Sequence, residues 1–450
     1  MKRTPYYETL LAKGGKFVEF GGYEMPIQFA GILKEHLAVR NNVGLFDVSH
    51  MGEFYIEGDN AEAAVNALIT NDIRGMADGD VRYTLMCNEK GGIVDDFLVY
   101  RYNQKKFLLV VNAGNHDKDY DWVKKYLDKS VTFTDRSPEI AQLAIQGPNA
   151  PALVKKFIDA SAMPSAYYTF KTFQCPKGEV IVSQTGYTGE DGYEIYCPKE
   201  WALDLFNQVM KAGEEFGIEL CGLGCRDTLR LEAGMPLYGH EMTEETLATE
   251  VTLKPFIKLE KEDFIGKKAL ETNEAKKIRK GFKMIDRGIA RDHDKVFLGD
   301  KEIGYVTTGT SSPSLKVGIG HMRIDRGIKD EEVFETKKKV PNNSVTLSTI
   351  HISKGLEYKE VFVADLDTSF SKRGYTGEGL FTETFGLSLN AETIAQSFGL
   401  NNSRLTELNE LYKLNSILIK LREREEEIRN LYVALTRAKN TLYLVSPSGI

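Results

Sequence analysis

The chain has 450 residues, of which 42% are hydrophobic and 27% are charged, and its formal net charge is −7. This composition is typical of a globular protein of about two to four domains, and the acidic balance argues against the chain as a whole being a nucleic-acid binder. The N-terminus lacks the apolar core of a signal peptide and no apolar run is long enough to span a bilayer. We therefore expect a cytoplasmic protein that does not enter a membrane.

Short strand and helix patterns alternate over the first part of the chain. Residues 52–57 alternate apolar and polar side chains as a half-buried strand does, and residues 61–69 have helical spacing. Residues 92–100 and 107–111 are expected to pair as strands around a turn at 103–104.

The same mixture continues along the chain. A helix is expected over residues 120–127, and residues 140–240 again mix strand and helix patterns. Residues 280–324 are rich in strand and turn patterns, whereas residues 328–344 are polar and charged without core periodicity and are expected to form a linker. These patterns predict an α/β (α+β) protein of several domains.

The last hundred residues predict a separate set of elements. Residues 345–350 and 361–364 are typical of buried strands, and residues 441–445 predict one more strand. Leucines at helical spacing over residues 405–421 indicate a packed helix face or a short coiled-coil seam.

The five cysteines are scattered and give no metal-ligand pattern. Cys221 and Cys225 lie four residues apart, but no His or Cys cluster stands nearby in the sequence. We expect free thiols and no metal site.

Two adjacent carboxylates, Asp95 and Asp96, lie at the start of an expected strand. Alternate residues of a strand share a face, so Val94, Asp96, Leu98 and Tyr100 should point one way and Asp95 the other. A carboxylate with apolar and aromatic neighbours is a candidate for acid/base work or for stabilising a cation. Taken alone, Asp96 is better explained by a structural role.

A glycine-rich loop and a helix start supply two further candidates. The loop at residues 186–192 enters a strand at Tyr193, and Glu194 follows, where a carboxylate could accept paired hydrogen bonds from an amino-pyrimidine-like edge. Arg226 lies in the first turn of an expected helix and could bind a carboxylate or a substrate anion. An ordinary ion pair would explain Arg226 as well.

In order and spacing, these motifs resemble the glycine cleavage system T protein family. The resemblance covers about 320 residues. Its segments are YETL at 7–10, MPI at 25–27, VSHMGE at 48–53, GGIVDD at 91–96, VVNA at 110–113, QGP at 146–148, GYTGEDGYEIY at 186–196, RDTLRLEAGMPLYGHE at 226–241, DFIGK at 263–267, VTTGT at 306–310 and SPSL at 312–315.

The resemblance implies a three-domain α/β enzyme that folds around tetrahydrofolate. Such an enzyme moves an aminomethyl group from the lipoyl arm of a carrier, the H-protein, to tetrahydrofolate and releases ammonia. By this resemblance Asp96 is the carboxylate beside the reactive folate nitrogens, and Glu194 and Arg226 bind the pterin or lie near it. The other implied pocket residues are Met51, Tyr83, Tyr100, Asn112, Tyr168 and Tyr238. No metal or pyridoxal cofactor is implied.

Related classes of protein fit less well. A non-catalytic folate-binding paralogue should show a Lys-Gly-Cys-Tyr-x-Gly-Gln-Glu type of motif, and the related flavin-dependent oxidases should show Gly-x-Gly-x-x-Gly; neither occurs. The family pattern stops near residue 326. We therefore expect folate-binding domains over residues 1–275 and a truncated C-terminal β-barrel over 276–326, which would lack a closing strand and expose an edge.

The remaining residues resemble a different family. After a linker at 327–343, residues 344–450 contain the segments TIHISKGLE at 349–357 and EEIRNLYVALTRA at 426–438, which resemble the last two motifs of UvrD-like superfamily 1 helicases. By this resemblance Arg437 is an arginine finger, and Gly355 and Glu357 lie at the nucleotide. The sequence has no Gly-x-x-x-x-Gly-Lys-Ser/Thr phosphate loop, so the tail is not expected to hydrolyse ATP by itself.

Two interpretations of the whole chain follow. In the first, a tetrahydrofolate-dependent aminomethyltransferase carries an inert helicase-derived fragment. In the second, the enzyme half is inactive and the fragment binds a partner or, weakly, DNA. The sequence favours the first.

Overall fold

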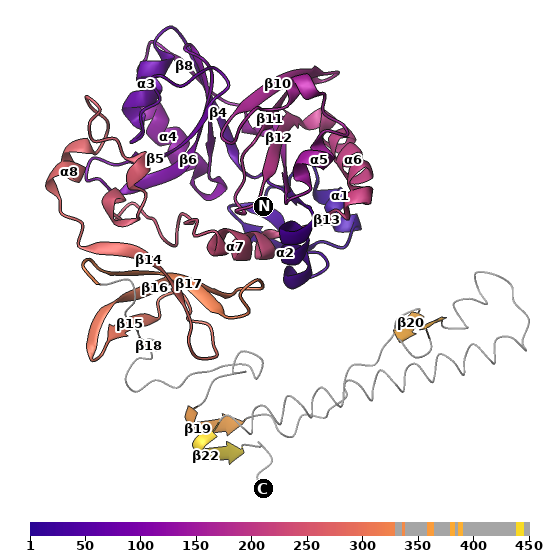
Figure 1. Cartoon of the computed structure of the whole chain (residues 1–450), viewed down its shortest axis with the longest axis vertical. Helices are drawn as coiled ribbons and strands as arrows, with labels where there is room; N and C mark the ends of the chain where they lie inside the picture. The colour runs from indigo at the N-terminus through magenta and orange to yellow at the C-terminus, as the bar shows by residue number, and fades with distance from the viewer. Residues whose placement is uncertain (329–334, 338–357, 364–378, 383–385, 390–437, 445–450) are drawn as a thin grey trace, which may run out of the picture. The chain divides into compact units, whose positions relative to one another are not determined.

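The computed structural model describes residues 1–328, 335–337, 358–363, 379–382, 386–389 and 438–444, and it divides into two units at residues 339 and 340. The first unit contains three large β-sheets (Figure 1).

The first sheet is antiparallel and has the order β5-β6-β7-β4-β8. Its strands are β4 (Gly52–Glu57), β5 (Val81–Cys87), β6 (Ile93–Asn103), β7 (Lys106–Val111) and β8 (Thr132–Asp135). Helices α3 (Ala61–Leu68) and α4 (His116–Tyr126) enclose an apolar core with one face of this sheet. The strand predicted at 52–57, the helix at 61–69 and the hairpin of 92–100 with 107–111 are confirmed, and the helix predicted at 120–127 begins earlier, at His116.

The prediction of which residues share a face of β6 is wrong for Val94. Asp95 pairs with Met86 but Ile93 pairs with Cys87, so Val94 is an extra residue in the strand. The resulting bulge turns Val94 into the core under the helices instead of onto the face of Asp96. Alternation therefore holds from Asp95 onward and fails before it.

The second sheet has the order β10-β11-β12-β9-β3-β13 and is antiparallel except for the β3–β13 pair. Its strands are β3 (Gly44–Asp47), β9 (Ile140–Gln146), β10 (Phe170–Cys175), β11 (Gly178–Ser183), β12 (Gly192–Pro198) and β13 (Glu219–Leu220). Helices α5 (Ala150–Val154) and α6 (Ala202–Gly213) pack on one face of this sheet. Tyr6 and Leu10, before and within α1 (Tyr7–Ala12), belong to the same core.

The two sheets face each other through a buried aromatic cluster. Tyr55 and Tyr100 of the first sheet pack with Phe170 and Tyr196 of the second, and the hydroxyl oxygens of Tyr100 and Tyr196 lie 2.9 Å apart. Helices α2 (Ile32–Asn41) and α7 (Leu223–Glu232) pack on each other, and α7 also packs on β2 (Tyr23–Gln28), which forms a hairpin with β1 (Lys16–Phe20). In Figure 1, α7 lies between these two sheets and the third, and α2 lies beside α7.

The third sheet is antiparallel, with the order β14-β17-β16-β15-β18. Its strands are β14 (Lys277–Lys283), β15 (Lys295–Leu298), β16 (Lys301–Ser311), β17 (Gly318–Asp325) and β18 (Glu335–Lys337), and α8 (Lys267–Thr272) precedes them. Among the described residues no pairing joins β14 to β18, so the sheet is open rather than a closed barrel. Residues 335–337, which we expected within a linker, add the edge strand β18.

In the second unit, β19 (Tyr358–Val363) pairs in parallel with β22 (Ala438–Leu444), and β20 (Gly379–Thr382) pairs antiparallel with β21 (Gly386–Leu389). The strands predicted at 361–364 and 441–445 coincide largely with β19 and β22. The strand predicted at 345–350 and the leucine-rich helix at 405–421 lie outside the described residues.

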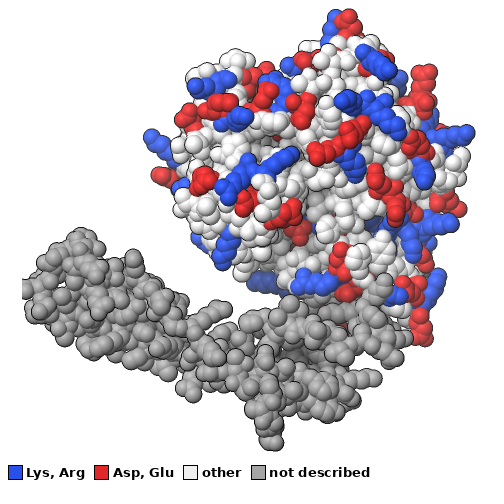
Figure 2. Space-filling view, turned by 180° about the vertical axis from the view of Figure 1, so that it is seen from behind, with Lys and Arg blue, Asp and Glu red and all other residues white. Residues whose placement is uncertain are grey.

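Acidic and basic side chains are interspersed on the face of the first unit shown in Figure 2. Of the helices in the described part of the chain, none is long and apolar enough to cross a membrane.

Candidate active site

A cavity of about 600 Å³ lies in the first unit, lined by the first and second sheets, by α7 and the chain after it, and by β14 of the third sheet. Eight of the nine side chains that the sequence assigned to a folate pocket line it. They are Met51, Tyr83, Asp96, Asn112, Tyr168, Glu194, Arg226 and Tyr238. Residues more than 170 positions apart in the sequence therefore meet at one site.

Tyr100 is the exception. Its side chain is fully buried in the aromatic cluster between the two sheets, where its ring packs edge-on against Phe170 and Tyr196. Tyr100 shares a face of β6 with Asp96, as predicted, but that face is divided between the cavity and the sheet-to-sheet core. We therefore correct its assignment from pocket wall to core.

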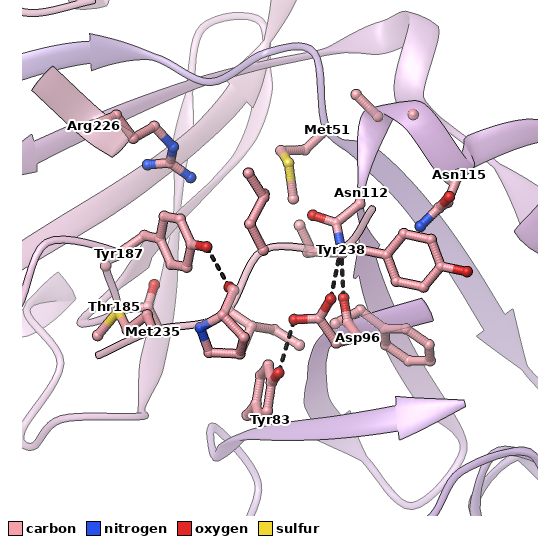
Figure 3. A pocket seen from close by; sticks show the side chains of 18 of the residues that line it. Met51, Tyr83, Asp96, Asn112, Asn115, Thr185, Tyr187, Arg226, Met235 and Tyr238 are labelled. Carbon is pink, nitrogen blue, oxygen red and sulfur yellow. Dashed lines mark hydrogen bonds between the residues drawn. The ribbon is translucent and has the colours of Figure 1, made fainter. Parts of the chain in front are cut away.

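Asp96 projects from β6 into the cavity and is fixed by two donors (Figure 3). The Tyr83 hydroxyl donates to Asp96 Oδ2 over 2.8 Å, and Asn112 Nδ2 donates to Oδ1 over 3.1 Å. Burial and the negative charge of Asp95 raise the pKa of Asp96 to about 7. This carboxyl can therefore gain or lose a proton close to neutral pH.

A second polar group lies on the far side of the cavity. The Thr185 hydroxyl donates to Glu194 Oε2 over 2.6 Å, and burial raises the pKa of Glu194. Arg226 lies across the cavity from Asp96 in Figure 3, with its guanidinium 4.9 Å from the ring of Tyr187. Burial lowers the pKa of Arg226, and its Nη1 atom has no hydrogen-bond partner among the described residues.

Two more unpaired polar atoms line the same cavity. Within the described residues, His50 Nδ1 and Gln142 Oε1 have no hydrogen-bond partner although both are buried. Burial lowers the pKa of His50 to about 3, so its imidazole is neutral. Buried polar atoms are rarely left unpaired, and three together in one cavity indicate a site that a polar ligand completes.

The glycines of the 186–192 loop make room for one side chain. A Cβ atom on Gly186 would lie 2.0 Å from Gln146 Oε1, and a Cβ on Gly192 would lie 2.2 Å from its Nε2. The Gln146 amide instead donates to Thr185 O and accepts from the Thr188 hydroxyl. The loop is thereby fixed on β9 with Thr185 facing the cavity.

Tyr168 reaches the cavity through an unusual backbone. Its φ of 61° lies in the left-handed region, which costs free energy for a tyrosine. Gln184 O accepts from Tyr168 N, and Tyr168 O accepts from Val81 N, so hydrogen bonds to both sheets fix this conformation.

Several lining residues were not identified from the sequence. Some lie within the same motifs as predicted residues, namely His50, Tyr187, Met235 and Leu237, and Thr185 directly precedes such a motif. Phe256 and Arg279 have no such signal, because only the tertiary fold brings the chain after α7 and strand β14 to the cavity.

Two other charged residues of the 226–241 motif, Arg230 and Glu241, bind the third sheet. Arg230 donates to Glu241 Oε2 over 2.9 Å, and the hydroxyls of Thr307 and Thr308 on β16 donate to Glu241 Oε1. Burial alone would raise the pKa of Glu241, but hydrogen bonding from His321 and the charge of Arg230 lower it well below its usual range. These residues attach the open sheet firmly beside the cavity.

Glu232 of α7 likewise connects α7 to α2 and to the chain that follows β16. It accepts from Arg40, from the Ser312 hydroxyl, and from both the backbone and the hydroxyl of Ser314. These donors outweigh burial and lower its pKa to about 2. The SPSL segment at 312–315 therefore holds the third sheet against α7.

No group of three His, Cys, Asp or Glu side chains in the described part of the chain is arranged to hold a metal ion. The tail residues Gly355, Glu357 and Arg437 lie outside the described residues.

Comparison with known domain families gives three matches. The GCVT N-terminal domain matches residues 6–261, and the glycine cleavage T-protein C-terminal barrel domain matches residues 277–346. The UvrD-like helicase C-terminal domain matches residues 324–448, so the last two matches overlap. The barrel match extends past residue 326, where the motifs stop, and includes β18.

Similar proteins agree with the first two matches. The chain is 46% identical over 330 residues to an aminomethyltransferase of a Thermoanaerobacter species, a match that spans 72% of this chain and 90% of that protein. It is 45% identical over 323 residues to an aminomethyltransferase of Desulfitobacterium hafniense, spanning 71% and 88%. The crystal structure of the glycine cleavage system aminomethyltransferase T from Bartonella henselae aligns with a TM-score of 0.70 at 31% identity, covering 75% of this chain and 94% of that one. The chain belongs to the glycine cleavage T protein family of aminomethyltransferases.

Proposed function

We propose that this protein is the aminomethyltransferase of the glycine cleavage system. It moves the aminomethyl carbon from the lipoyl arm of an H-protein to tetrahydrofolate and releases ammonia. The family membership supports this function, and relatives are matched over about nine-tenths of their length. The single observation that carries it is Asp96, a carboxyl with a pKa of about 7 that faces a large cavity.

The residues of the cavity fit a folate. A cavity of about 600 Å³ is within the usual range for a small-molecule site. Glu194 can accept hydrogen bonds from an amino-pyrimidine edge, and the free Nη1 of Arg226 can donate to a ring carbonyl. Tyr83, Tyr168 and Tyr238 offer aromatic surfaces for the flat ring system and the benzoyl group.

Asp96 then has two tasks. Tetrahydrofolate supplies two amine nitrogens between which a one-carbon bridge forms. The Asp96 carboxylate can accept a proton at Oδ1 or Oδ2 and return it, and its negative charge stabilises positive charge near it. Tyr83 and Asn112 fix the carboxylate in one orientation, so no reorganisation is needed when charge develops.

We propose that the helicase-like segment is an appended fragment without ATPase activity of its own. The match to residues 324–448 and the missing phosphate loop support this assignment. Our domain boundaries of 1–275, 276–326, 327–343 and 344–450 need one change: we place the end of the barrel-type sheet near residue 339 to include β18.

The test of the proposed function is the Asp96→Asn variant. Turnover with lipoylated H-protein and tetrahydrofolate should fall by about 100- to 10,000-fold, because an amide cannot take a proton. Circular dichroism and folate binding should be retained. The control is Asp204→Asn on the exposed side of α6, which should keep full activity. Full turnover by Asp96→Asn would refute the role of Asp96.

A further inference from the structure

The extra residue of β6, Val94, lies two positions before Asp96. On β5, Met86 pairs with Asp95 and the next residue pairs with Ile93, so Val94 is left without a partner there. The pairs of β6 with β7 begin farther along the strand. Val94 is fully buried, so its backbone carbonyl, which belongs to neither ladder, needs a donor from another part of the chain.

This bulge decides which of the two adjacent aspartates faces the cavity. Val94, Phe97 and Val99 pack in the core under the helices, and Asp96 lines the cavity on the other face of the sheet. A one-residue slip in a strand moves every side chain to the opposite face. Strict alternation from Val94 would therefore place Asp95 in the cavity and Asp96 in the core, and the bulge reverses this assignment.

One chain of hydrogen bonds satisfies the carbonyls of the bulge. Lys118 Nζ, from α4, donates to Val94 O over 2.6 Å and to the Tyr238 hydroxyl oxygen over 2.8 Å. The Tyr238 hydroxyl donates in turn to Ile93 O over 3.0 Å. Two consecutive carbonyls of β6 are thus bound by side chains that come from α4 and from the chain after α7.

The ring and the hydroxyl of Tyr238 have separate surroundings. The ring lines the cavity, whereas the hydroxyl points away from Asp96 and is bonded to Lys118 and to Ile93 O (Figure 3). Lys118 itself lies outside the cavity wall, with its Nζ 4.3 Å from the centroid of the Tyr238 ring. Removing the hydroxyl alone therefore leaves the aromatic wall of the cavity in place.

We propose that Lys118 and the Tyr238 hydroxyl are positioning residues for the transfer reaction. They donate to the two carbonyls of the bulge and thereby hold β6 in the register that directs Asp96 into the cavity. This proposal rests on the role of Asp96 in the proposed function. It gives Lys118 a task in the reaction and gives Tyr238 a second one besides lining the folate pocket.

The first test compares Lys118→Met and Tyr238→Phe with the unaltered full chain. In each variant kcat with lipoylated H-protein and tetrahydrofolate should fall by about 10-fold or more, because a displaced carboxylate loses its alignment. The Kd for tetrahydrofolate, measured by calorimetry, should change less than about threefold, since the ring of Tyr238 remains. Lys118→Arg should recover most of the turnover, because a guanidinium has donors for both acceptors.

The decisive comparison repeats both substitutions in the Asp96→Asn background. There they should lower the residual rate by less than about twofold, because the carboxylate that they position is already absent. An equal fall of the rate in both backgrounds would overturn the proposal. Lys124→Met, exposed on the same helix, is the matched control and should keep full turnover.

Hydrogen exchange followed by mass spectrometry tests the proposal without turnover. Exchange of the segment 93–100 should be about 10-fold faster in Lys118→Met and in Tyr238→Phe, and exchange of α6 should be unchanged. Unchanged exchange of this segment would overturn the proposal, and Tyr238→Phe alone decides the matter if Lys118→Met does not fold. Failure of the proposed function gives a different result: exchange would respond as predicted, but the unaltered protein would show no turnover with H-protein and tetrahydrofolate.

Discussion

Two arginines one helical turn apart on α7 have opposite environments. Arg230 donates to Asp227, Glu241, Thr308 and the backbone, so its guanidinium is bound on every side. Arg226 lines the cavity, and its Nη1 has no partner among the described residues. Arg230 is buried and Arg226 is half-buried, and both belong to the same stretch of sequence.

The carboxylates of the two regions differ in the same way. At the joint with the third sheet, donors lower the pKa values of Glu232 and Glu241 below their ordinary range. In the cavity, burial raises the pKa values of Asp96 and Glu194. Buried charges with complete sets of partners stabilise the fold, whereas those with incomplete sets cost stability and are available to a ligand.

The largest expected effect is on stability, at the contact between α7 and the third sheet. Glu241→Ala leaves Arg230 buried without its main anion and should lower the free energy of unfolding by about 3–5 kcal/mol. Urea unfolding followed by tryptophan fluorescence measures this, because Trp122 and Trp201 both lie in the first unit. Glu245→Ala, exposed in the next turn of the chain, should change stability little. A loss below about 1 kcal/mol in Glu241→Ala would contradict the structural role.

Glu232→Gln should have a smaller effect of about 2 kcal/mol at pH 7. The folded-state pKa of about 2 lies below the ordinary value of 4.5, so the charge stabilises the fold above about pH 4.5. That contribution is lost as the pH falls toward 2. Urea unfolding at pH 7 and at pH 4 should therefore show a smaller difference between variant and unaltered protein at the lower pH. An equal or larger difference at pH 4 would show that Glu232 acts otherwise.

Asp96→Asn should change stability in the opposite direction. The folded-state pKa of about 7 exceeds the ordinary 3.8, so the folded protein binds more protons than the unfolded chain between these values, and stability falls as the pH rises. At pH 8 the variant should be more stable by about 1 kcal/mol, since the carboxylate faces a cavity that water can enter. Thermal unfolding at pH 8 and at pH 4 checks this, and the gain should vanish at pH 4. Destabilisation at pH 8 would place Asp96 with the structural carboxylates.

Local patterns in the sequence predicted much of the first unit. The alternation of residues 52–57 and the helical spacing of 61–69 correspond to β4 and α3. The extra residue at Val94 was not predictable, because a bulge depends on the register with β5. The strand β18 was missed for a similar reason: its residues form a strand only through pairing with β15.

The sequence predicted those site residues that lie within recognisable motifs. Asp96, Glu194 and Arg226 lie within recognisable segments and do meet at the cavity. Tyr100 was misplaced because alternation predicts a face but not which part of that face a second sheet covers. Arg279 was missed because it comes from the third sheet, and no local pattern reveals that contact.

The most direct test of the central claim is calorimetric titration of the full chain with tetrahydrofolate at pH 7, beside Arg226→Met and Arg230→Met. We expect saturable binding by the unaltered protein. The affinity of Arg226→Met should be about 10- to 100-fold lower, because the variant loses the guanidinium that would donate a hydrogen bond to the ligand. Arg226→Met should keep its thermal stability, and Arg230→Met should lose stability instead. No binding by the folded protein, or equal binding by Arg226→Met, would contradict the assignment of this cavity as the folate site.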